Sequence, residues 1–405
     1  MANNIYDLGI IGCGVAGTFA TYKLHKDYKN VKTIVIDSGR PPAKRRSQMQ
    51  GFLGLLPNSD GKFFLNDLNK VSDLSGLRKS KSAFNQFQKI ISNVNTFKII
   101  KDRSPNISIE KKLNKIGYEV TTNDYIQLYP KDIHTLSKYI SELTENSKNI
   151  TFSFDNEVKS ICKQKNTFII TTEDQEYKCK KIIIAVGRSG WRWANNLYHS
   201  FGIVDNNDYA KFGIHIELNA QLMKDFNKSN CTLTKANEIE IGPFSWLGTI
   251  IPEDHSDLVI SSFRANENRW KSDKVSFSLI GNRFFPKKGS EQTDRIGKLT
   301  FILANDRIIK EKVSNIVNNK SKISIIPEYN WLKQYILELS TVIPEILTKA
   351  YFYIPCVSPT ISNINIGNNL ESEIDGMYVI GESANINGLL GAATTGLISI
   401  DSIFK

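Results

Sequence analysis

Three spaced glycines near the start of the chain limit its fold more than any other feature. Gly12, Gly14 and Gly17 follow an apolar stretch that predicts a buried strand, and they open a stretch with helical spacing of apolar residues. In such a unit the first glycine permits a tight turn, the second lets a pyrophosphate lie against bare backbone, and the third lets helix and strand pack closely. A purely structural turn is the alternative. We expect Gly12, Gly14, Val15, Ala16 and Gly17 to contact a dinucleotide, because the helix N-terminus adds free N–H groups and a positive dipole.

An acid at the end of the next apolar run supports the dinucleotide interpretation. Residues 31–36 predict a second strand, and Asp37 and Ser38 follow it directly. A carboxylate at this place in a βαβ unit binds the ribose hydroxyls, and it repels a 2′-phosphate. The sequence therefore predicts FAD or NAD at this site, and not NADP.

Two later segments return to the same chemistry. Residues 181–190 predict a buried strand that ends in a turn of small residues, and residues 376–382 predict a strand that ends in glycine and an acid. Small residues at such positions let the chain pass close to a cofactor. The expected contacts from these segments and from the helix start at 387–396 are Ala185, Gly187, Gly381, Glu382, Gly391 and Ala392.

Further contacts are expected from the connections between these segments. Arg45 lies in a basic run after the second strand, where it reaches back to phosphate or adenine or else belongs to a solvated loop. The loop 51–62 is rich in glycine yet apolar, which suits a backbone lying against a flat ring system. Gly54 and Ser59 from this loop, and Val158 from a later predicted strand, complete the expected cofactor contacts.

Composition narrows the class of protein. The formal charge of +11 is compatible with a nucleic-acid partner or an anionic substrate. However, the chain is rich in Asn, Lys and Ile together, as an AT-rich coding sequence produces, and its lysines look dispersed. Nucleic acid is therefore an open but not favoured partner. Five scattered cysteines argue against a metal site or a disulfide framework. The chain shows no long apolar run or leader, so we expect a cytoplasmic protein without a membrane partner.

The three separated nucleotide segments resemble those of FAD-dependent oxidoreductases of the glutathione-reductase-like and hydroxybenzoate-hydroxylase-like superfamily. More narrowly, the chain resembles bacterial FAD-dependent dehydrogenases through residues 59–62 (Ser-Asp-Gly-Lys), 185–190 (Ala-Val-Gly-Arg-Ser-Gly) and the strand 213–217. Two features depart from that family. Glu382 stands where the family has Asp, and residues 239–246 lack the usual cysteine-containing segment.

The resemblance implies an α/β fold, in which a Rossmann-type FAD-binding domain, with a parallel sheet and an antiparallel meander, is interrupted by a mixed-sheet substrate domain. We place the meander at 150–171, and the length of the chain favours more than one domain. The predicted division is FAD-binding at 1–66, 126–196 and 351–405, a helical insertion or cap at 67–125, and a substrate domain at 197–350.

The implied activity is that of an FAD-dependent oxidoreductase, a dehydrogenase or reductase that acts on a small organic substrate by hydride transfer at the flavin. Because no second glycine-turn unit is found, NAD(P)H is expected only as a transient reductant. His215 and Arg264 are the candidate catalytic residues, with Arg188 and Trp270 as further candidates for anchoring substrate. The alternatives are a flavin-dependent monooxygenase or halogenase, and a flavoprotein that modifies a nucleic-acid base. The oligomeric state stays open.

Overall fold

The computed structural model describes residues 5–45, 49–54, 56–203, 207–255, 257–265, 272–305 and 307–405. One sheet is built on parallel strands in the order β7-β2-β1-β10, and β20 pairs in parallel with the far side of β10. These strands are β1 (Ile5–Ile11), β2 (Thr33–Ile36), β7 (Ile150–Ser153), β10 (Glu176–Ile184) and β20 (Met377–Val379). Helix α1 (Val15–Asp27) connects β1 to β2. This order is that of a Rossmann-type sheet, which confirms the predicted fold class.

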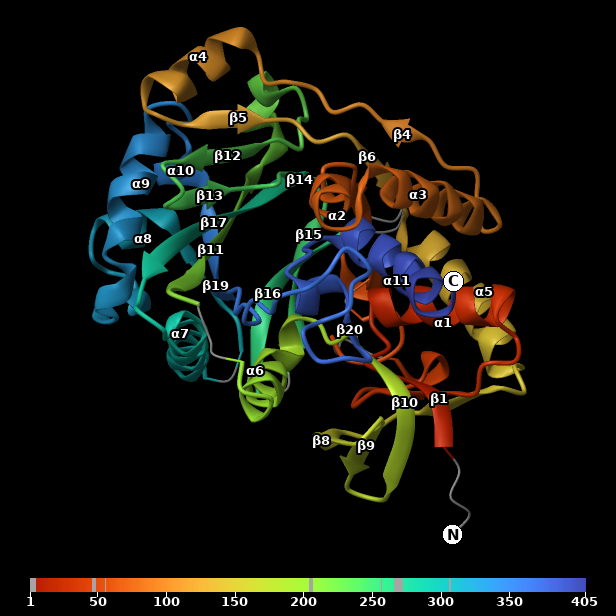
Figure 1. Cartoon of the computed structure of the whole chain (residues 1–405). Coiled ribbons are helices and arrows are strands. Elements are labelled where there is room, and N and C mark those ends of the chain that lie inside the picture. The colour runs from red at the N-terminus through yellow and green to blue at the C-terminus, as the bar shows by residue number, and fades with distance from the viewer. Residues whose placement is uncertain are drawn as a thin grey trace.

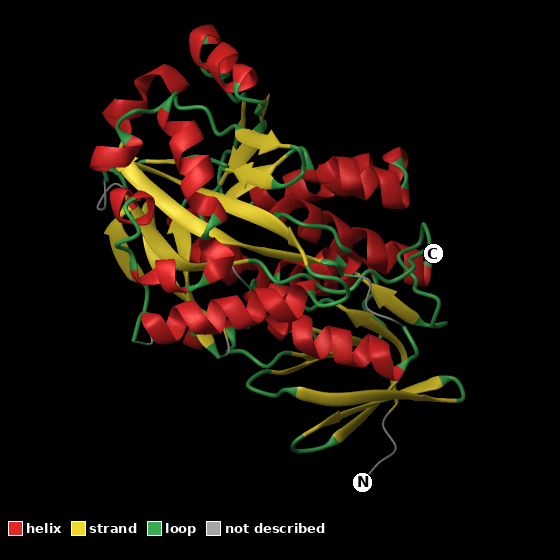
Figure 2. Ribbon diagram, turned by 90° about the vertical axis from the view of Figure 1, so that its left-hand side faces the viewer, coloured by secondary structure: helices red, strands yellow, loops and turns green. Residues whose placement is uncertain are grey.

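Strand β10 belongs both to the parallel sheet and to an antiparallel meander. Its first residues pair with β9 (Thr167–Thr172), which pairs with β8 (Val158–Gln164), and the meander projects at the end where the N-terminus lies (Figures 1 and 2). The prediction that residues 150–154 belong to this meander is wrong, because β7 pairs in parallel with β2. Helix α5 (Pro130–Glu145) precedes β7 and supplies the crossover that parallel pairing needs.

The second large sheet has the order β18-β19-β11-β17-β13-β12-β5, with β14 also on β17, and its described strands pair antiparallel. Figure 1 shows the two sheets in separate halves of the molecule, with the β15–β16 hairpin between them. The strands of the second sheet are β5 (Glu119–Thr121), β11 (Tyr209–Asn219), β12 (Thr232–Lys235), β13 (Ile239–Ile241), β14 (Ser245–Trp246), β17 (Lys274–Phe284), β18 (Ile309–Lys312) and β19 (Tyr351–Val357). The separate hairpin consists of β15 (Thr249–His255) and β16 (Leu258–Arg264). The helices of this half are α4 (Ile107–Lys115), α7 (Gly289–Leu303), α8 (Val313–Val317), α9 (Trp331–Ser340) and α10 (Ile346–Lys349). Helix α6 (Trp191–Ser200) packs with the core of the first sheet.

Each half has its own hydrophobic core. One core draws on residues 8–198 and 361–403, and the other on residues 109–118 and 210–357. Residues 67–125 contribute to both, through α2 (Asp67–Ser75) and α3 (Leu77–Ser92) on one side and α4 on the other. A small sheet of β3 (Lys62–Phe64), β6 (Tyr125–Gln127) and β4 (Ile99–Ile100) lies beside α3 in Figure 1. The domain boundaries given above stay a prediction. In the part of the chain described, no helix combines the length and apolarity needed to cross a bilayer.

Helix α1 packs directly on the last helix, α11 (Leu389–Phe404). The two backbones approach so closely at Gly396 that a Cβ atom there would lie 2.3 Å from the carbonyl oxygen of Ala16. Glycine at this position therefore sets the separation of the two helices, and with it the position of the first turn of α1.

Replacing Gly396 by alanine tests this contact. Alanine in a helix interior is normally about 1 kcal/mol more favourable than glycine. Here we expect the Gly396→Ala variant to lose about 1–3 kcal/mol of unfolding free energy, because the methyl group overpacks against backbone. Gly297→Ala in α7 is the control, since its Cβ would meet only side-chain methyl groups of Val357 and Leu258, at 3.2–3.4 Å. Urea unfolding of both variants measures the difference, and a Gly396→Ala protein as stable as the wild type would contradict the interpretation.

Candidate functional site

The glycine turn between β1 and α1 presents to a cavity helix amides that have no partner within the helix. Gly12 has φ +98°, and its N–H donates to the Ile36 carbonyl at 2.8 Å, which ties the turn to β2. The first helical hydrogen bond of α1 runs from Thr18 N–H to the Gly14 carbonyl at 2.9 Å. The N–H groups of residues 15–17 precede that bond, and the first turn of α1 carries no acidic residue. The positive end of the helix dipole therefore faces the cavity with its amides available.

Gly14 and Gly17 have different roles in this turn. A Cβ at Gly17 would lie 2.0 Å from the Gly12 carbonyl oxygen, so Gly17 permits the helix to fold back onto the turn. A Cβ at Gly14 would meet no atom closer than the Cα of Gly54, at 3.9 Å. The space beside Gly14 is thus open on the cavity side, which is where a ligand would lie against the backbone.

The side chain of Asp37 is buried beside the same turn. Its Oδ2 accepts the N–H of Cys13 at 2.5 Å, and its Oδ1 accepts the N–H of Gly39 at 2.7 Å. Burial raises the pKa of this carboxyl above its usual value, and the backbone hydrogen bonds oppose that shift. Asp37 also lines the cavity, so the carboxylate fixes the turn and faces any ligand there.

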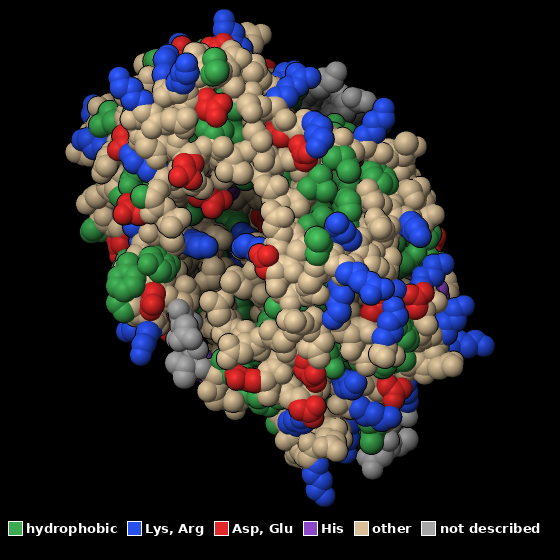
Figure 3. All heavy atoms as spheres, turned by 45° about the horizontal axis from the view of Figure 1, so that its top comes forward, with side chains coloured by type: hydrophobic (Ala, Val, Ile, Leu, Met, Phe, Trp, Pro, Cys, Tyr) green, Lys and Arg blue, Asp and Glu red, His purple; other side chains and the backbone are tan. Residues whose placement is uncertain are grey.

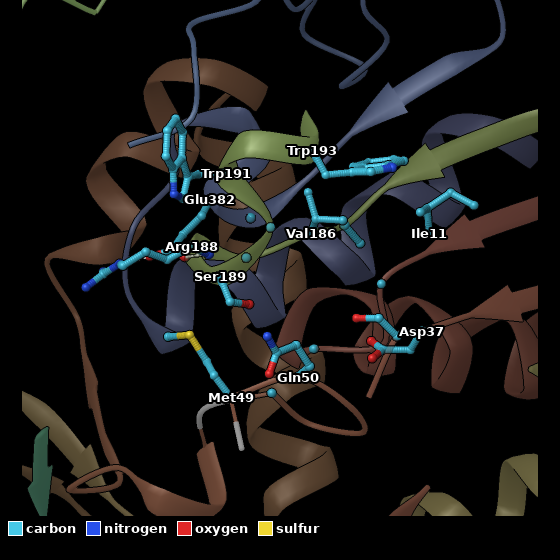
Figure 4. Close-up of a pocket in the computed structure, with 18 of the residues that line it drawn as sticks. Ile11, Asp37, Met49, Gln50, Val186, Arg188, Ser189, Trp191, Trp193 and Glu382 are labelled. Atoms are coloured by element: carbon cyan, nitrogen blue, oxygen red, sulfur yellow. Dashed lines mark hydrogen bonds and ion pairs between the residues drawn. The ribbon is translucent and has the colours of Figure 1, made fainter. Parts of the chain in front are cut away.

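The cavity has a volume of about 640 Å³ and lies outside the carboxyl ends of the parallel strands. Its walls come from the ends of β1, β2 and β10, from residues 49–54 and 156–158, from the first residues of α6, and from the turn before α11. In Figure 4, Trp193, Val186 and Ile11 lie on one side, Asp37, Gln50 and Met49 on the other, and Trp191, Arg188 and Glu382 toward one end. The three sequence segments of the predicted nucleotide site therefore meet around one space.

Most of the residues expected to contact a cofactor line this cavity: Gly12, Gly14, Val15, Ala16, Asp37, Ser38, Gly54, Val158, Ala185, Gly187, Gly381, Glu382 and Ala392. Four others are held elsewhere. Gly17 packs on Gly12, and the Arg45 guanidinium donates to the Gly54 carbonyl. The Ser59 hydroxyl donates to the Leu56 carbonyl and accepts the Gly61 N–H, both at 3.0 Å. The fourth, Gly391, binds an acid described below.

Glu382 joins the turns that follow β10 and β20. Its Oε2 accepts the backbone N–H of Arg188 at 2.6 Å, and its Oε1 accepts the Arg188 guanidinium at 2.8 Å. The attraction of this carboxylate raises the pKa of Arg188. The long side chain of glutamate reaches the turn after β10, so Glu382 connects two walls of the cavity through hydrogen bonds to Arg188.

Sequence reasoning missed Asp67, the first residue of α2. Leu390 N–H donates to Asp67 Oδ2 at 3.2 Å, and Gly391 N–H also donates to this carboxylate. The N-terminus of α11 is therefore already satisfied by an acid from the chain itself, unlike that of α1. Burial raises the pKa of Asp67 to about 7, against the lowering effect of the two amides. No local sequence pattern connects Asp67 to a helix more than 300 residues later.

A charged cluster that the sequence also did not indicate borders the cavity. Arg192 of α6 contacts Asp294 of α7 at 2.6 Å and Asp257 at 3.6 Å, and Lys298 contacts the same two acids at 3.2 and 2.7 Å. Arg192, Asp257 and Asp294 line the cavity. The cluster connects both halves of the molecule at that border, since α6 packs with the first core and α7 with the second.

The candidate catalytic residues lie away from the cavity lining. The Ser261 hydroxyl donates to the Pro355 carbonyl at 2.8 Å, so His215 Nδ1–H donates to Ser261, at 2.7 Å. Burial lowers the pKa of His215 to about 3, which keeps the ring neutral. Arg264 ends β16 at an exposed position, and Trp270 lies outside the described residues. Their catalytic roles stay predictions.

No protein-family model and no curated protein matches the chain. Among solved structures, the chain is similar to glycine oxidases from Geobacillus kaustophilus (13% identity, TM-score 0.46) and Bacillus cereus (16%, 0.45), with 98% of this chain and 94% of each oxidase covered. It is also similar to the halogenase PltM in complex with FAD (15%, 0.47), covering 97% of this chain and 67% of PltM.

The pKa of Asp67 gives a testable pH dependence. The folded value of about 7 lies above the value of about 3.9 for an unfolded Asp. The stability contributed by protonating Asp67 is therefore complete below about pH 4 and is lost as the pH rises through 7. Asparagine does not titrate, so we expect the wild type to lose stability relative to Asp67→Asn across this window. Thermal unfolding of both proteins between pH 4.5 and 8.5 measures this loss of stability. The control is Asp73→Asn, which replaces an exposed aspartate. A difference in melting temperature that stays constant with pH would contradict the burial argument.

Proposed function

We propose that the chain binds FAD in this cavity and acts as an FAD-dependent oxidoreductase. The observation that carries the proposal is the combination of the first-turn α1 amides, which have no partner within the helix, and the Asp37 carboxylate at one cavity. Helix N-terminal amides suit a pyrophosphate, and a carboxylate after the second strand suits ribose hydroxyls. The volume of about 640 Å³ lies within the range of about 300–1,000 Å³ that is typical of small-molecule sites.

The residues present fit an extended dinucleotide. The backbone at residues 12–16 would hold the diphosphate, and Asp37 would hold the adenosine ribose, next to residues 156–158. The rest of the cavity runs past residues 49–54 to the Arg188–Glu382 pair and the turn before α11, which would surround the ring end. Because Asp67 satisfies the amides of α11, the diphosphate belongs on α1 and not on α11.

Bound FAD would supply hydride transfer, and the chain would orient it and exclude water. The resemblance to FAD-dependent dehydrogenases in the sequence supports a small organic substrate. The Arg188–Glu382 pair would place a fixed, compensated charge pair beside the ring end, where the cavity also has the indole of Trp191 as a wall. Oxygen uptake driven by NAD(P)H distinguishes the monooxygenase or halogenase alternative from the dehydrogenase, which transfers electrons to an acceptor without needing oxygen.

Gly14 offers a sharp test of FAD binding. A Cβ at this position meets no close atom but extends into the cavity, so Gly14→Val is expected to fold and to weaken FAD binding at least tenfold. Gly14→Ala is expected to give a smaller loss. Titration with FAD, followed by flavin fluorescence, measures affinity, and the melting temperature of the ligand-free variants checks folding.

Competition between FAD and nucleotide fragments tests the adenosine diphosphate part of the site by itself. We expect ADP to compete with FAD, and 2′,5′-ADP to compete much more weakly, because Asp37 repels the 2′-phosphate. A wild-type protein that binds neither FAD nor ADP, or a well-folded Gly14→Val protein that binds FAD normally, would contradict the proposal.

A further inference from the structure

The excess positive charge of the chain is concentrated in one segment. Residues 68–118 contain eleven Lys and Arg residues and three acids, an excess of eight charges where the whole chain has +11. A compositional bias toward lysine would spread this excess over 405 residues. The whole connection between β3 and β6, residues 65–124, adds three acids, Asp67, Glu119 and Asp124, and still carries an excess of five positive charges. This concentration of positive charge therefore needs a local reason.

All eleven cations of this segment are solvent-exposed. Lys101 pairs with Asp124, and Lys79 donates to the Asn368 carbonyl. The others form no ion pair with the described residues. Of the three acids, Asp102 is engaged internally, since its carboxylate accepts the backbone N–H groups of Asn123 and Asn230. The segment thus presents positive charge that the protein itself does not compensate.

Large aliphatic side chains are exposed in the same segment. Leu77 is 59% exposed, Ile99 42%, Ile100 36% and Ile107 72%. Ile99 and Ile100 form β4, which pairs only with β6 among the described strands and so lies at the edge of its sheet. Ile99 and Ile100 thus place two adjacent exposed aliphatic side chains directly after the exposed Lys98, a combination that suits a partner with both anionic and apolar groups.

The segment lies along one side of the molecule. Figure 1 shows α3, β4 and α4 following one another along the top, over both halves of the fold. Figure 3 brings this side forward and shows Lys and Arg side chains spread over it, with hydrophobic side chains exposed among them. None of residues 68–118 lines the cavity, so this surface, the 68–118 surface, is distinct from the nucleotide site.

We propose that the 68–118 surface binds the surface of an anionic lipid membrane. Cations near anionic headgroups attract the protein, and aliphatic side chains enter the boundary between headgroups and acyl chains. Single-stranded nucleic acid is less well matched, because its bases stack on exposed aromatic rings, and the large exposed side chains of this segment are aliphatic. A peripheral surface needs no spanning helix, so the lack of a long apolar run does not oppose it.

Co-sedimentation of the full-length protein with lipid vesicles tests the proposal. At about 0.15 M salt, we expect binding to vesicles of phosphatidylcholine mixed with phosphatidylglycerol, and none to phosphatidylcholine alone. The triple variant Arg78→Gln/Lys81→Gln/Lys98→Gln should reduce the partition coefficient about 100-fold, from roughly fivefold per charge. Ile99→Thr/Ile100→Thr should weaken binding to the anionic vesicles at the same salt concentration, because it removes the aliphatic contribution and leaves the charge unchanged.

A matched triple variant controls for net charge. Lys165→Gln/Lys320→Gln/Lys349→Gln removes three exposed cations outside the segment and should bind vesicles like the wild type. FAD affinity, or the melting temperature, shows that each variant is folded. Absence of binding to anionic vesicles, or an equal loss in the control variant, would overturn the proposal. RNA binding that depends on Arg78, Lys81 and Lys98, without vesicle binding, would replace the lipid with nucleic acid as the partner.

Discussion

The contact of helix α1 with the turn before it determines where the rest of the site lies. Gly17 lets α1 fold back until its backbone touches Gly12, and Gly396 lets α11 pack on the other side of the same helix. In both contacts the nearest atom is a backbone carbonyl oxygen. Side-chain rearrangement therefore cannot remove the steric overlap that a larger residue would cause at either position. The first-turn amides of α1 are thereby aimed past the ends of β1 and β2, into the cavity. The strands and turns around it then supply the walls.

Among the helices that begin at this cavity, α1 and α11 differ in what their N-terminal amides bind. The first turn of α1 contains no acidic residue, whereas the first N–H groups of α11 donate to the carboxylate of Asp67 in α2. The positive dipole of α1 is therefore left for a ligand, and that of α11 is neutralised internally. A similar balance holds between Arg188 and Glu382, which compensate one another across two strand ends. The cavity thus combines the electropositive N-terminus of α1, which has no acid in its first turn, with the paired side chains of Arg188 and Glu382.

On the surface, the pairing of positive charges with acids differs from one region to another. Positive charge is compensated around α6 and α7, where Arg192 and Lys298 meet two aspartates, but not along residues 68–118. A count of lysines along the sequence makes the charge look dispersed. In the structure, the eleven Lys and Arg side chains of this segment are exposed, whereas the Asp102 carboxylate accepts backbone N–H groups. The surface of the segment is therefore net positive. This face shares no residue with the cavity lining, so the two proposed partners would not compete for one site.

The sequence by itself determined the parallel βαβ unit with its glycine turn, because glycine spacing, apolar runs and Asp37 lie within some thirty residues of one another. It also located the strands before Gly187 and Gly381, whose small residues are needed wherever the backbone passes close to a ligand. Only the tertiary structure decided which side chains meet across long separations. It placed β7 beside β2 and not in the meander, brought Asp67 to α11, and turned Glu382 toward Arg188. The physical reason is that backbone conformation is encoded locally, whereas hydrogen bonds and ion pairs between distant segments depend on how whole helices and strands pack.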